Sequence, residues 1–309
     1  MGSDGQRRRV DRELVRRGLV PSREEAQRVI DARRVQVDGA PVRKASSLVL
    51  PSQQLLVGGP PPRFVSRGGE KLQGAVERFG LDLTGRTVLD AGISTGGFTD
   101  CALQAGAAQV IGVDVGYGQL AERLRRDPRV TLHERTNVRT LQPDQLEGLP
   151  ADVLVADLSF ISLTTVLPVL LPLLHADGSA VVLVKPQFEV GRARIGRGGI
   201  VRDPQDWRTA LVRVAGSTAT LGWPMHALMP SPITGTQGNV EFLALLRRGV
   251  PSDTSGVASY LDVLVDAALA EVEARTDGAS TAGAPHAPEP PGVAEHVYEH
   301  LHERRGASR

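Results

Sequence analysis

One stretch constrains the fold of this chain more than any other: the glycine-rich turn at residues 90–100, Asp-Ala-Gly-Ile-Ser-Thr-Gly-Gly-Phe-Thr-Asp. The apolar run 87–89 before it predicts a buried strand, and apolar residues at helical spacing after it predict a helix. A carboxylate at a strand end followed by glycines at a helix N-terminus is typical of a cofactor-binding turn in an open α/β sheet. We expect the glycines to let a ligand approach the backbone closely.

The spacing within the turn narrows the choice of ligand. Its glycines do not match the G-x-G-x-x-G pattern of dinucleotide folds, and the Asp90 carboxylate would repel a pyrophosphate but attract an ammonium group. A second predicted strand ends in Asp114, 24 positions later, where a carboxylate is expected to accept both hydroxyls of a ribose. An amino-acid head and a ribose occur together in S-adenosylmethionine, which we predict as the cofactor. A nicotinamide site with a degraded pattern is the alternative.

The predicted cofactor contacts come from the turn and from the ends of the next two strands. They are Asp90, Gly92, Ser94, Gly96, Gly97, Phe98, Asp114, Val115 and Asn137. Core packing is an equally strong interpretation of Phe98, because phenylalanine is so often buried.

The rest of the chain alternates strand and helix patterns, which predicts a Rossmann-like, doubly wound α/β sheet of the class I methyltransferase type. Strands are expected at 87–90, 109–114, 130–133, 152–157, 179–185 and 240–246, with a long helix at about 205–221. A further amphipathic helix is expected around 260–272, and a Gly/Ala/Pro-rich tail follows it.

The length of the chain indicates more than one domain, and its composition excludes several classes of protein. At 309 residues it exceeds one typical domain of about 100–200 residues. It has no signal-peptide pattern and no run of about 18 apolar residues that could span a bilayer, so we expect a cytoplasmic protein with no membrane association. The single cysteine, Cys101, has no partner for an internal disulfide. We predict no metal site, because His296 and His300 lack further ligands nearby.

We expect a small N-terminal α+β domain at residues 8–60, a catalytic domain at 61–249 and a C-terminal helix with a disordered tail at 250–309. The first 60 residues carry eleven arginines and one lysine against seven acidic residues. Within them Ser22 to Glu25 forms a capping box for a helix, and Asp38-Gly39 predicts a tight turn between strands. The linker Gly58-Gly-Pro-Pro-Pro62 separates the two domains.

Basic side chains on a small helix pair suit phosphates, although a solvated charged face is the alternative. The sequence 14–26, followed by 35–39, resembles the small RNA-binding domain first described in a ribosomal protein and also carried by pseudouridine synthases and tyrosyl-tRNA synthetases. A second arginine group lies in the glycine-rich loop 191–199. The predicted RNA contacts are Arg16, Arg17, Arg28, Arg33, Arg34, Arg67, Arg192, Arg194 and Arg197.

Ionisable residues follow two other apolar runs, where strand ends line the ligand crevice of such sheets: Asp157 and Lys185. Glu241 lies inside an apolar strand and needs a cation, for which Lys71 or Lys185 would serve. Only three of the 36 basic residues are lysines, so a retained lysine suggests a task that guanidinium cannot perform, such as losing a proton. If the three lysines were distributed at random among the 36 basic positions, two of them would occupy positions 71 and 185 about once in 200 cases.

Lys71, Asp157, Lys185 and Glu241 occur in the order of the Lys-Asp-Lys-Glu tetrad of ribose 2′-O-methyltransferases. With the runs at 113–120, 134–138, 157–162 and 185–189, the chain resembles the TlyA family, whose catalytic domain is FtsJ-like, over about residues 8–248.

The resemblance implies methylation of cytidine ribose 2′-hydroxyls in 16S or 23S ribosomal RNA, or in both, with ribosomal RNA and ribosomal subunits as partners. One departure is the linker Pro62-Arg-Phe-Val65, where relatives have an Arg and a Trp, so its part in coupling the two domains is open. A non-catalytic ribosome-assembly protein, and the haemolysin that gave the family an older label, are the alternatives.

In the expected mechanism Lys185 accepts the proton of the ribose hydroxyl, with burial and the cation Lys71 favouring its neutral amine. Asp157 would orient Lys185, and Glu241 would hold Lys71. Alternatively, Lys185 only steers the hydroxyl while water takes the proton.

Overall fold

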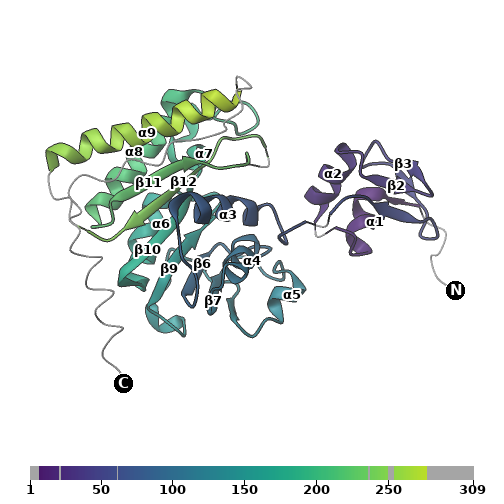
Figure 1. The fold of residues 1–309 in the computed structure, drawn as a ribbon, viewed down its shortest axis with the longest axis horizontal. Helices are drawn as coiled ribbons and strands as arrows, with labels where there is room; N and C mark the ends of the chain where they lie inside the picture. The colour runs from purple at the N-terminus through teal and green to yellow at the C-terminus, as the bar shows by residue number, and fades with distance from the viewer. Residues whose placement is uncertain (1–6, 21, 61, 236, 250–253, 277–309) are drawn as a thin grey trace. The chain divides into compact units, whose positions relative to one another are not determined.

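The computed structural model describes residues 7–20, 22–60, 62–235, 237–249 and 254–276 (Figure 1). By internal packing the chain divides into two compact units, Met1–Asn137 and Val138–Arg309.

The first unit begins with a small domain built on two helices and short strands. Its elements are β1 (Arg8–Arg9), α1 (Val10–Arg16), α2 (Arg23–Asp31), β2 (Val35–Val37), β3 (Ala40–Pro41), β4 (Leu48–Val49) and β5 (Leu55–Val57). The Ser22 hydroxyl accepts a hydrogen bond from the Glu25 amide, as the capping box predicts. Strands β3, β2 and β5 form an antiparallel sheet, and β1 pairs with β4. Apolar side chains of both helices, such as Leu14 and Ile30, share one core with those of the strands.

The remainder of the first unit carries the glycine turn. Its elements are α3 (Gly68–Phe79), β6 (Thr87–Ala91), α4 (Gly97–Gln104), β7 (Gln109–Val113), α5 (Glu122–Arg125) and β8 (Val130–His133). Strands β6, β7 and β8 pair in parallel, so their carboxyl ends lie at one edge. Helix α3 ends at Gly80, which adopts the left-handed conformation at its C-cap.

The second unit carries the other strands of the sheet and the helices that pack on them. Its elements are η1 (Pro143–Gln145), β9 (Ala151–Ala156), α6 (Leu163–Leu170), η2 (Leu171–Leu173), β10 (Leu174–Val184), α7 (Pro186–Glu189), η3 (Arg192–Arg194), α8 (Pro204–Thr220), β11 (Met225–Pro230), β12 (Phe242–Arg247) and α9 (Thr254–Thr276). Strands β9 and β10 are parallel, whereas β12 runs antiparallel to both β10 and β11. The complete sheet has seven strands in the order β11-β12-β10-β9-β6-β7-β8, which confirms the predicted fold class.

Every predicted strand of the sheet is present within a few residues, but β11 was not predicted. Its sequence, Met-His-Ala-Leu-Met-Pro, lacks β-branched residues and ends in a proline, so the pattern gives no strand signal. As an edge strand, β11 tolerates Pro230, whose missing N–H would disrupt an interior ladder.

Helix α9 confirms the amphipathic helix expected near the C-terminus. The helix packs against α8 and β11 (Figure 1), and it buries Leu264, Val265, Ala268 and Val272. None of the described helices has the length and apolar character needed to cross a membrane. The predicted disordered tail, with His296 and His300, lies outside the described residues.

Candidate active site and RNA-binding surface

The glycine turn places the Asp114 carboxylate in a fixed position at the end of β7. The amide of Ser94 donates to Asp114 Oδ2 at 2.8 Å, and the amide of Gly116 donates to Oδ1 at 2.7 Å. Ser94 reaches this position by adopting a φ of +46°, which is uncommon for a residue with a side chain. Because each carboxylate oxygen has two lone pairs, Asp114 retains acceptor capacity for a ribose.

Gly96 and Gly97 are positions of the turn with no room for a side chain. A Cβ at Gly96 would come within 2.4 Å of Leu124 Cδ1, and one at Gly97 within 2.3 Å of Ser66 Oγ. Protein packing on these sides of the turn, together with the φ of +94° at Gly96, therefore already requires these two glycines, and the approach of a ligand to the turn stays a prediction.

Asp90 and Phe98 lie in the protein interior. Asp90 is fully buried, and the Thr99 hydroxyl on α4 donates to its Oδ2 at 2.6 Å. Phe98 is also buried, which favours the core-packing interpretation. Val115, in contrast, is 74% exposed beside Asp114, and Asn137 is exposed as well.

Lys185 and Asp157 meet at the ends of two neighbouring strands. β9 and β10 are parallel and pair Ala156 with Val182, so the residues that follow them emerge at one edge. Lys185 Nζ lies 2.6 Å from Asp157 Oδ1, and the lysine is only 8% exposed. Nζ also donates to the Ser159 hydroxyl at 3.0 Å. Sequence reasoning did not single out Ser159; the only available signal was its place two residues after Asp157.

Glu241 and Lys71 are each buried in their own unit. Glu241 directly precedes β12 and is 4% exposed, and its amide carbonyl accepts a bond from the Ser231 amide. A Cβ on Gly235 would come within 2.7 Å of Glu241 Oε1, so the loop passes close to this carboxylate. Lys71 lies on α3 and is 8% exposed. The pairing of Lys71 with Glu241 stays a prediction.

Glu189 is a buried carboxylate near Lys185 that sequence reasoning did not assign to the site. The Ser162 hydroxyl donates to its Oε2 at 2.5 Å, and the Leu163 amide donates to its Oε1 at 2.7 Å. Burial raises the pKa of this carboxyl group above its usual value, with the two hydrogen bonds acting in the opposite direction.

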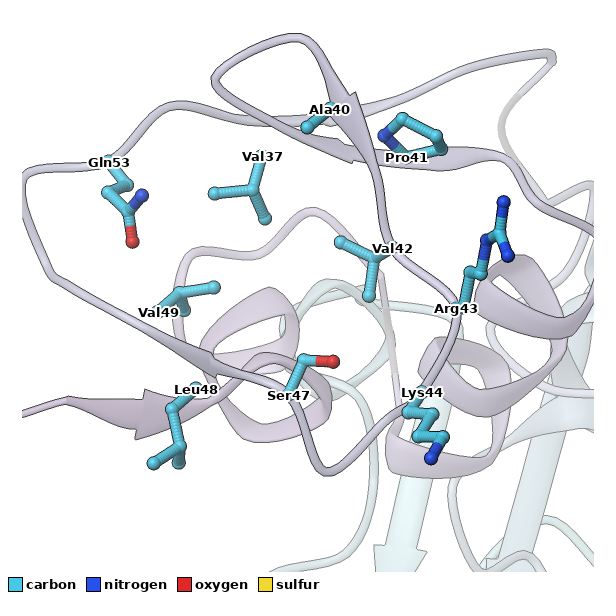
Figure 2. Close-up of a pocket in the computed structure, with 10 residues that line it drawn as sticks. All are labelled: Val37, Ala40, Pro41, Val42, Arg43, Lys44, Ser47, Leu48, Val49 and Gln53. Carbon is cyan, nitrogen blue, oxygen red and sulfur yellow. The ribbon is translucent and has the colours of Figure 1, made fainter.

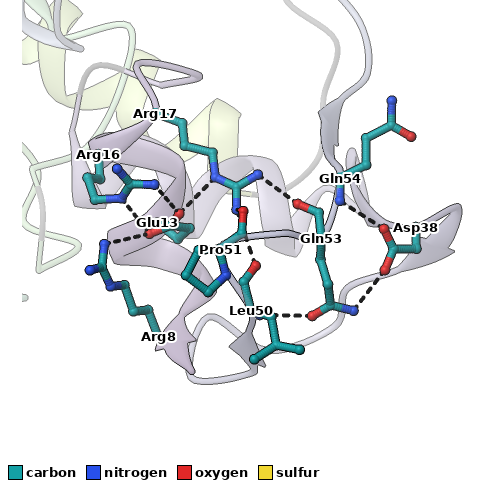
Figure 3. Close-up of polar contacts among 9 residues, drawn as sticks. All are labelled: Arg8, Glu13, Arg16, Arg17, Asp38, Leu50, Pro51, Gln53 and Gln54. Atoms are coloured by element: carbon teal, nitrogen blue, oxygen red, sulfur yellow. Dashed lines mark hydrogen bonds and ion pairs between the residues drawn. The ribbon is translucent and has the colours of Figure 1, made fainter. Parts of the chain in front are cut away.

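Several arginines of the small domain are engaged by the protein itself (Figure 3). Arg17 donates from all three guanidinium nitrogens, to Glu13 and to the carbonyls of Leu50, Pro51 and Gln53. This bonding pattern is that of a structural residue, so the structure gives no support to Arg17 as a phosphate contact.

The other predicted RNA contacts differ in how far they are engaged. Arg16 pairs with Glu13, Arg28 with Glu25, and Arg34 donates to the carbonyls of Gly58 and Pro60. Arg194 bonds to Asp206 and remains half exposed. Arg33, Arg192 and Arg197 are exposed, and Arg67 precedes the first residue of α3.

A pocket of 460 Å³ opens in the small domain, beside the turn that joins β2 and β3 (Figure 2). Its lining combines apolar side chains, among them Val42 and Leu48, with the basic residues Arg43 and Lys44. Leu48 is 55% exposed at this pocket. Lys44 is one of the three lysines of the chain and was not among the predicted RNA contacts.

Comparison with known proteins gives matches to both domains. Residues 64–248 match the FtsJ-like methyltransferase family, and residues 8–55 match the S4 domain. The 16S/23S rRNA (cytidine-2′-O)-methyltransferase TlyA of Mycobacterium tuberculosis is 48% identical over 266 residues, 86% of this chain and 98% of that protein.

Two further proteins are similar to most of this chain. YqxC of Bacillus subtilis, which carries an rRNA methyltransferase name, is 47% identical over 76% of this chain and 84% of its own. Among solved structures, a Streptococcus thermophilus protein named as a hemolysin has a TM-score of 0.69 at 36% identity, covering 89% of this chain and 100% of that one.

Proposed function

The chain belongs to the FtsJ-like methyltransferase family, and we propose that it methylates the ribose 2′-hydroxyl of cytidines in ribosomal RNA with S-adenosylmethionine. The observation that carries this proposal is the contact between the buried Lys185 and the Asp157 carboxylate, 2.6 Å apart at the ends of β9 and β10. The near full-length similarity to an enzyme named for this reaction supports it. The S4 domain would supply RNA binding, and action on ribosomes would place the protein in the cytoplasm.

The residues of the turn fit S-adenosylmethionine. Asp114 would accept the ribose hydroxyls, and the exposed Val115 would contact the adenine, with Asn137 at its edge. Gly92 and Ser94 would face the methionine part, whereas Asp90, Gly96, Gly97 and Phe98 would shape the turn from behind. When bound, the cofactor supplies a methyl group activated by its sulfonium.

The catalytic residues in this proposal are Lys71, Asp157, Lys185 and Glu241. Lys185 Nζ contacts the ribose hydroxyl and accepts its proton, while Asp157 and Ser159 orient the amine. Glu241 holds Lys71. If Lys185 instead only steers the hydroxyl, water takes the proton, and an arginine at this position would retain activity.

The RNA-binding surface in this proposal is centred on the small domain. Arg43 and Lys44 at the pocket supply cations, and the exposed Leu48 offers an apolar surface to an unpaired base. Arg16, Arg28, Arg33, Arg67, Arg192, Arg194 and Arg197 remain proposed phosphate contacts. Arg17 is omitted because its guanidinium is engaged, and Arg34 because it bonds to the linker.

The test is methyl transfer from labelled S-adenosylmethionine into 30S and 50S subunits that lack the modification, followed by mapping of 2′-O-methyl sites. We expect label on cytidines with wild-type protein and none with Lys185→Ala. RNA binding without transfer by the wild type would instead indicate an assembly factor. Lysis of erythrocytes by the Lys185→Ala variant would indicate a haemolysin.

A further inference from the structure

Two sequence runs of the second unit are only partly explained by the proposed mechanism. The strand-end loop, residues 157–162, follows β9, and the Lys185 segment, residues 185–189, follows β10. The mechanism uses Asp157 and Ser159 from the first run and Lys185 from the second. It gives no role to Ser162 or Glu189, which are the last residues of the two runs.

The two runs contact one another along their whole length, in matching order. At one end, Asp157 and Ser159 both contact Lys185. In the middle, the rings of Phe160 and Phe188 lie 5.4 Å apart. At the other end, Glu189 accepts hydrogen bonds from the loop terminus, at Ser162 and Leu163. The strand-end loop is therefore held at both of its ends by the Lys185 segment.

The conformation of the strand-end loop requires such holding. Phe160 has a φ of +64°, a left-handed conformation that costs a residue with a side chain about 1 kcal/mol or more. Its side chain is 91% exposed, so the burial of this side chain offsets little of the conformational cost. The contacts that maintain the turn are therefore those on either side of Phe160.

Glu189 is the better anchored of these two contacts. Its side chain is 2% exposed, and Arg213 on α8 donates to its main-chain carbonyl at 2.7 Å. Ser162, which it holds, is also the N-cap of α6 and accepts a bond from the Thr164 amide. Glu189 thus joins the loop to two helices, whereas Lys185 must remain able to engage substrate.

We propose that Glu189 is a positioning residue for methyl transfer, whose carboxylate holds the strand-end loop so that Asp157 and Ser159 lie beside Lys185. This inference rests on the proposed function. Glu189 touches neither substrate nor cofactor; it acts through the position of the Lys185 amine.

The test compares Glu189→Gln with Asp203→Asn in the full-length protein. Asp203 is a matched control, because its carboxylate also caps a helix of the same unit, accepting from the Gln205 amide at 2.9 Å, but it lies outside the two runs. Glutamine keeps the size of Glu189, but its NH₂ group cannot accept the second of the two hydrogen bonds.

We expect Glu189→Gln to lower kcat about 10- to 100-fold, because small displacements of catalytic groups are this costly, with KM for both substrates unchanged. Asp203→Asn should keep kcat within about twofold, since asparagine is also a good N-cap and its Oδ1 can still accept the bond from the Gln205 amide. A folded Glu189→Gln protein with wild-type kcat, or with an effect confined to KM, would overturn the inference.

Ser162→Ala removes one of the two bonds and serves as the second variant. If Glu189→Gln does not fold, an unchanged kcat in Ser162→Ala overturns the inference and a reduced kcat with unchanged KM supports it. An inactive wild-type protein would refute the proposed function. An active wild type with a fully active Glu189→Gln refutes only the role of Glu189.

Discussion

Glu13 in the small domain and Glu189 in the second unit are both buried glutamates, but their partners differ. Glu13 is fully buried and faces the guanidinium groups of Arg8, Arg16 and Arg17. The hydrogen bond from Arg16, together with a smaller effect of the bond from Arg17, outweighs burial and lowers the pKa of Glu13 to about 2. Glu189 has only neutral donors at its carboxylate, and burial raises its pKa. Its partners thus favour the charged form of Glu13, whereas burial disfavours the charged form of Glu189.

The difference follows from the size of the apolar core that each region can bury. The small domain spans about 50 residues and can bury only a limited apolar core, so additional stabilising interactions are valuable there. Its arginines form a network with Asp11 and Glu13, in which Asp11 accepts from Arg9 and Arg23. The second unit has a large apolar core and uses its buried polar groups to position loops at strand ends. Charged partners hold Glu13 in the small domain, whereas neutral hydrogen bonds hold Glu189 in the second unit.

The Lys185–Asp157 pair is the most demanding test of this comparison, because it is a salt bridge close to the neutral hydrogen bonds of Glu189. We expect Asp157→Asn to lower kcat about 100-fold or more, since the amine loses the group that orients it. We expect its free energy of unfolding to change by less than about 1 kcal/mol, because Asp157 keeps 22% exposure and solvent weakens the pair. Methyl transfer and urea unfolding on the same preparation measure both; a large loss of stability would contradict the comparison.

Glu13→Gln tests the charged network directly. Removing the charge of one partner of a buried ion pair should destabilise the small domain by about 3 kcal/mol, because Arg16 and Arg17 lose the anion and one of the two oxygens that they share. Amide hydrogen exchange in α1 of the full-length protein measures the effect. The control is Glu122→Gln, which breaks an exposed pair with Arg126 and should cost about 0.5 kcal/mol or less. Equal effects of the two variants would show that the network around Glu13 is ordinary surface charge.

Acid should affect the small domain first. The pKa values of Asp11 and Glu13 are lowered to about 2, mainly by hydrogen bonds from Arg9 and Arg16 respectively. A lowered pKa contributes stability that is fully present above the unfolded values of 3.8 and 4.5 and is lost as pH falls toward 2. Hydrogen exchange between pH 5 and 3, conditions about one unit either side of these values, should show α1 losing protection. The Glu13→Gln variant should show a shallower dependence on pH.

The contribution of Glu189 to stability should change with pH in the opposite direction to that of Asp11 and Glu13, and by the smallest amount. Because its pKa is raised, its contribution to stability is present below the unfolded value of 4.5 and is lost as pH rises through the folded value. The stability of wild type relative to Glu189→Gln should therefore fall as pH rises above 4.5. Urea unfolding followed by tryptophan fluorescence measures it, since both tryptophans, Trp207 and Trp223, lie in this unit. A relative stability that increases with pH would mean that Glu189 is held charged after all.

The parts of this structure that sequence predicted are those with local signals. The glycine turn, the apolar strands and the acid or lysine at a strand end all appear as short patterns, and Lys185 and Asp157 do lie together. The bonds that Lys185 donates to Ser159 and that Ser162 donates to Glu189 were not predictable, because no local pattern marks the two serines or Glu189 as contact residues. Arg17 was predicted as an RNA contact for the same reason. An arginine in a basic run gives no sign of the three carbonyls to which it donates, 33 to 36 positions away.

Helix α9 has a practical consequence for the handling of this protein. The match to the methyltransferase family ends at residue 248, so an expression fragment cut at that boundary would lack the helix. The cut would uncover the apolar surface of α8 and β11 that Leu264, Val265 and Val272 cover. It would also leave β11, an edge strand, open to pairing with other molecules. Such a fragment should aggregate even though it contains every residue assigned to catalysis.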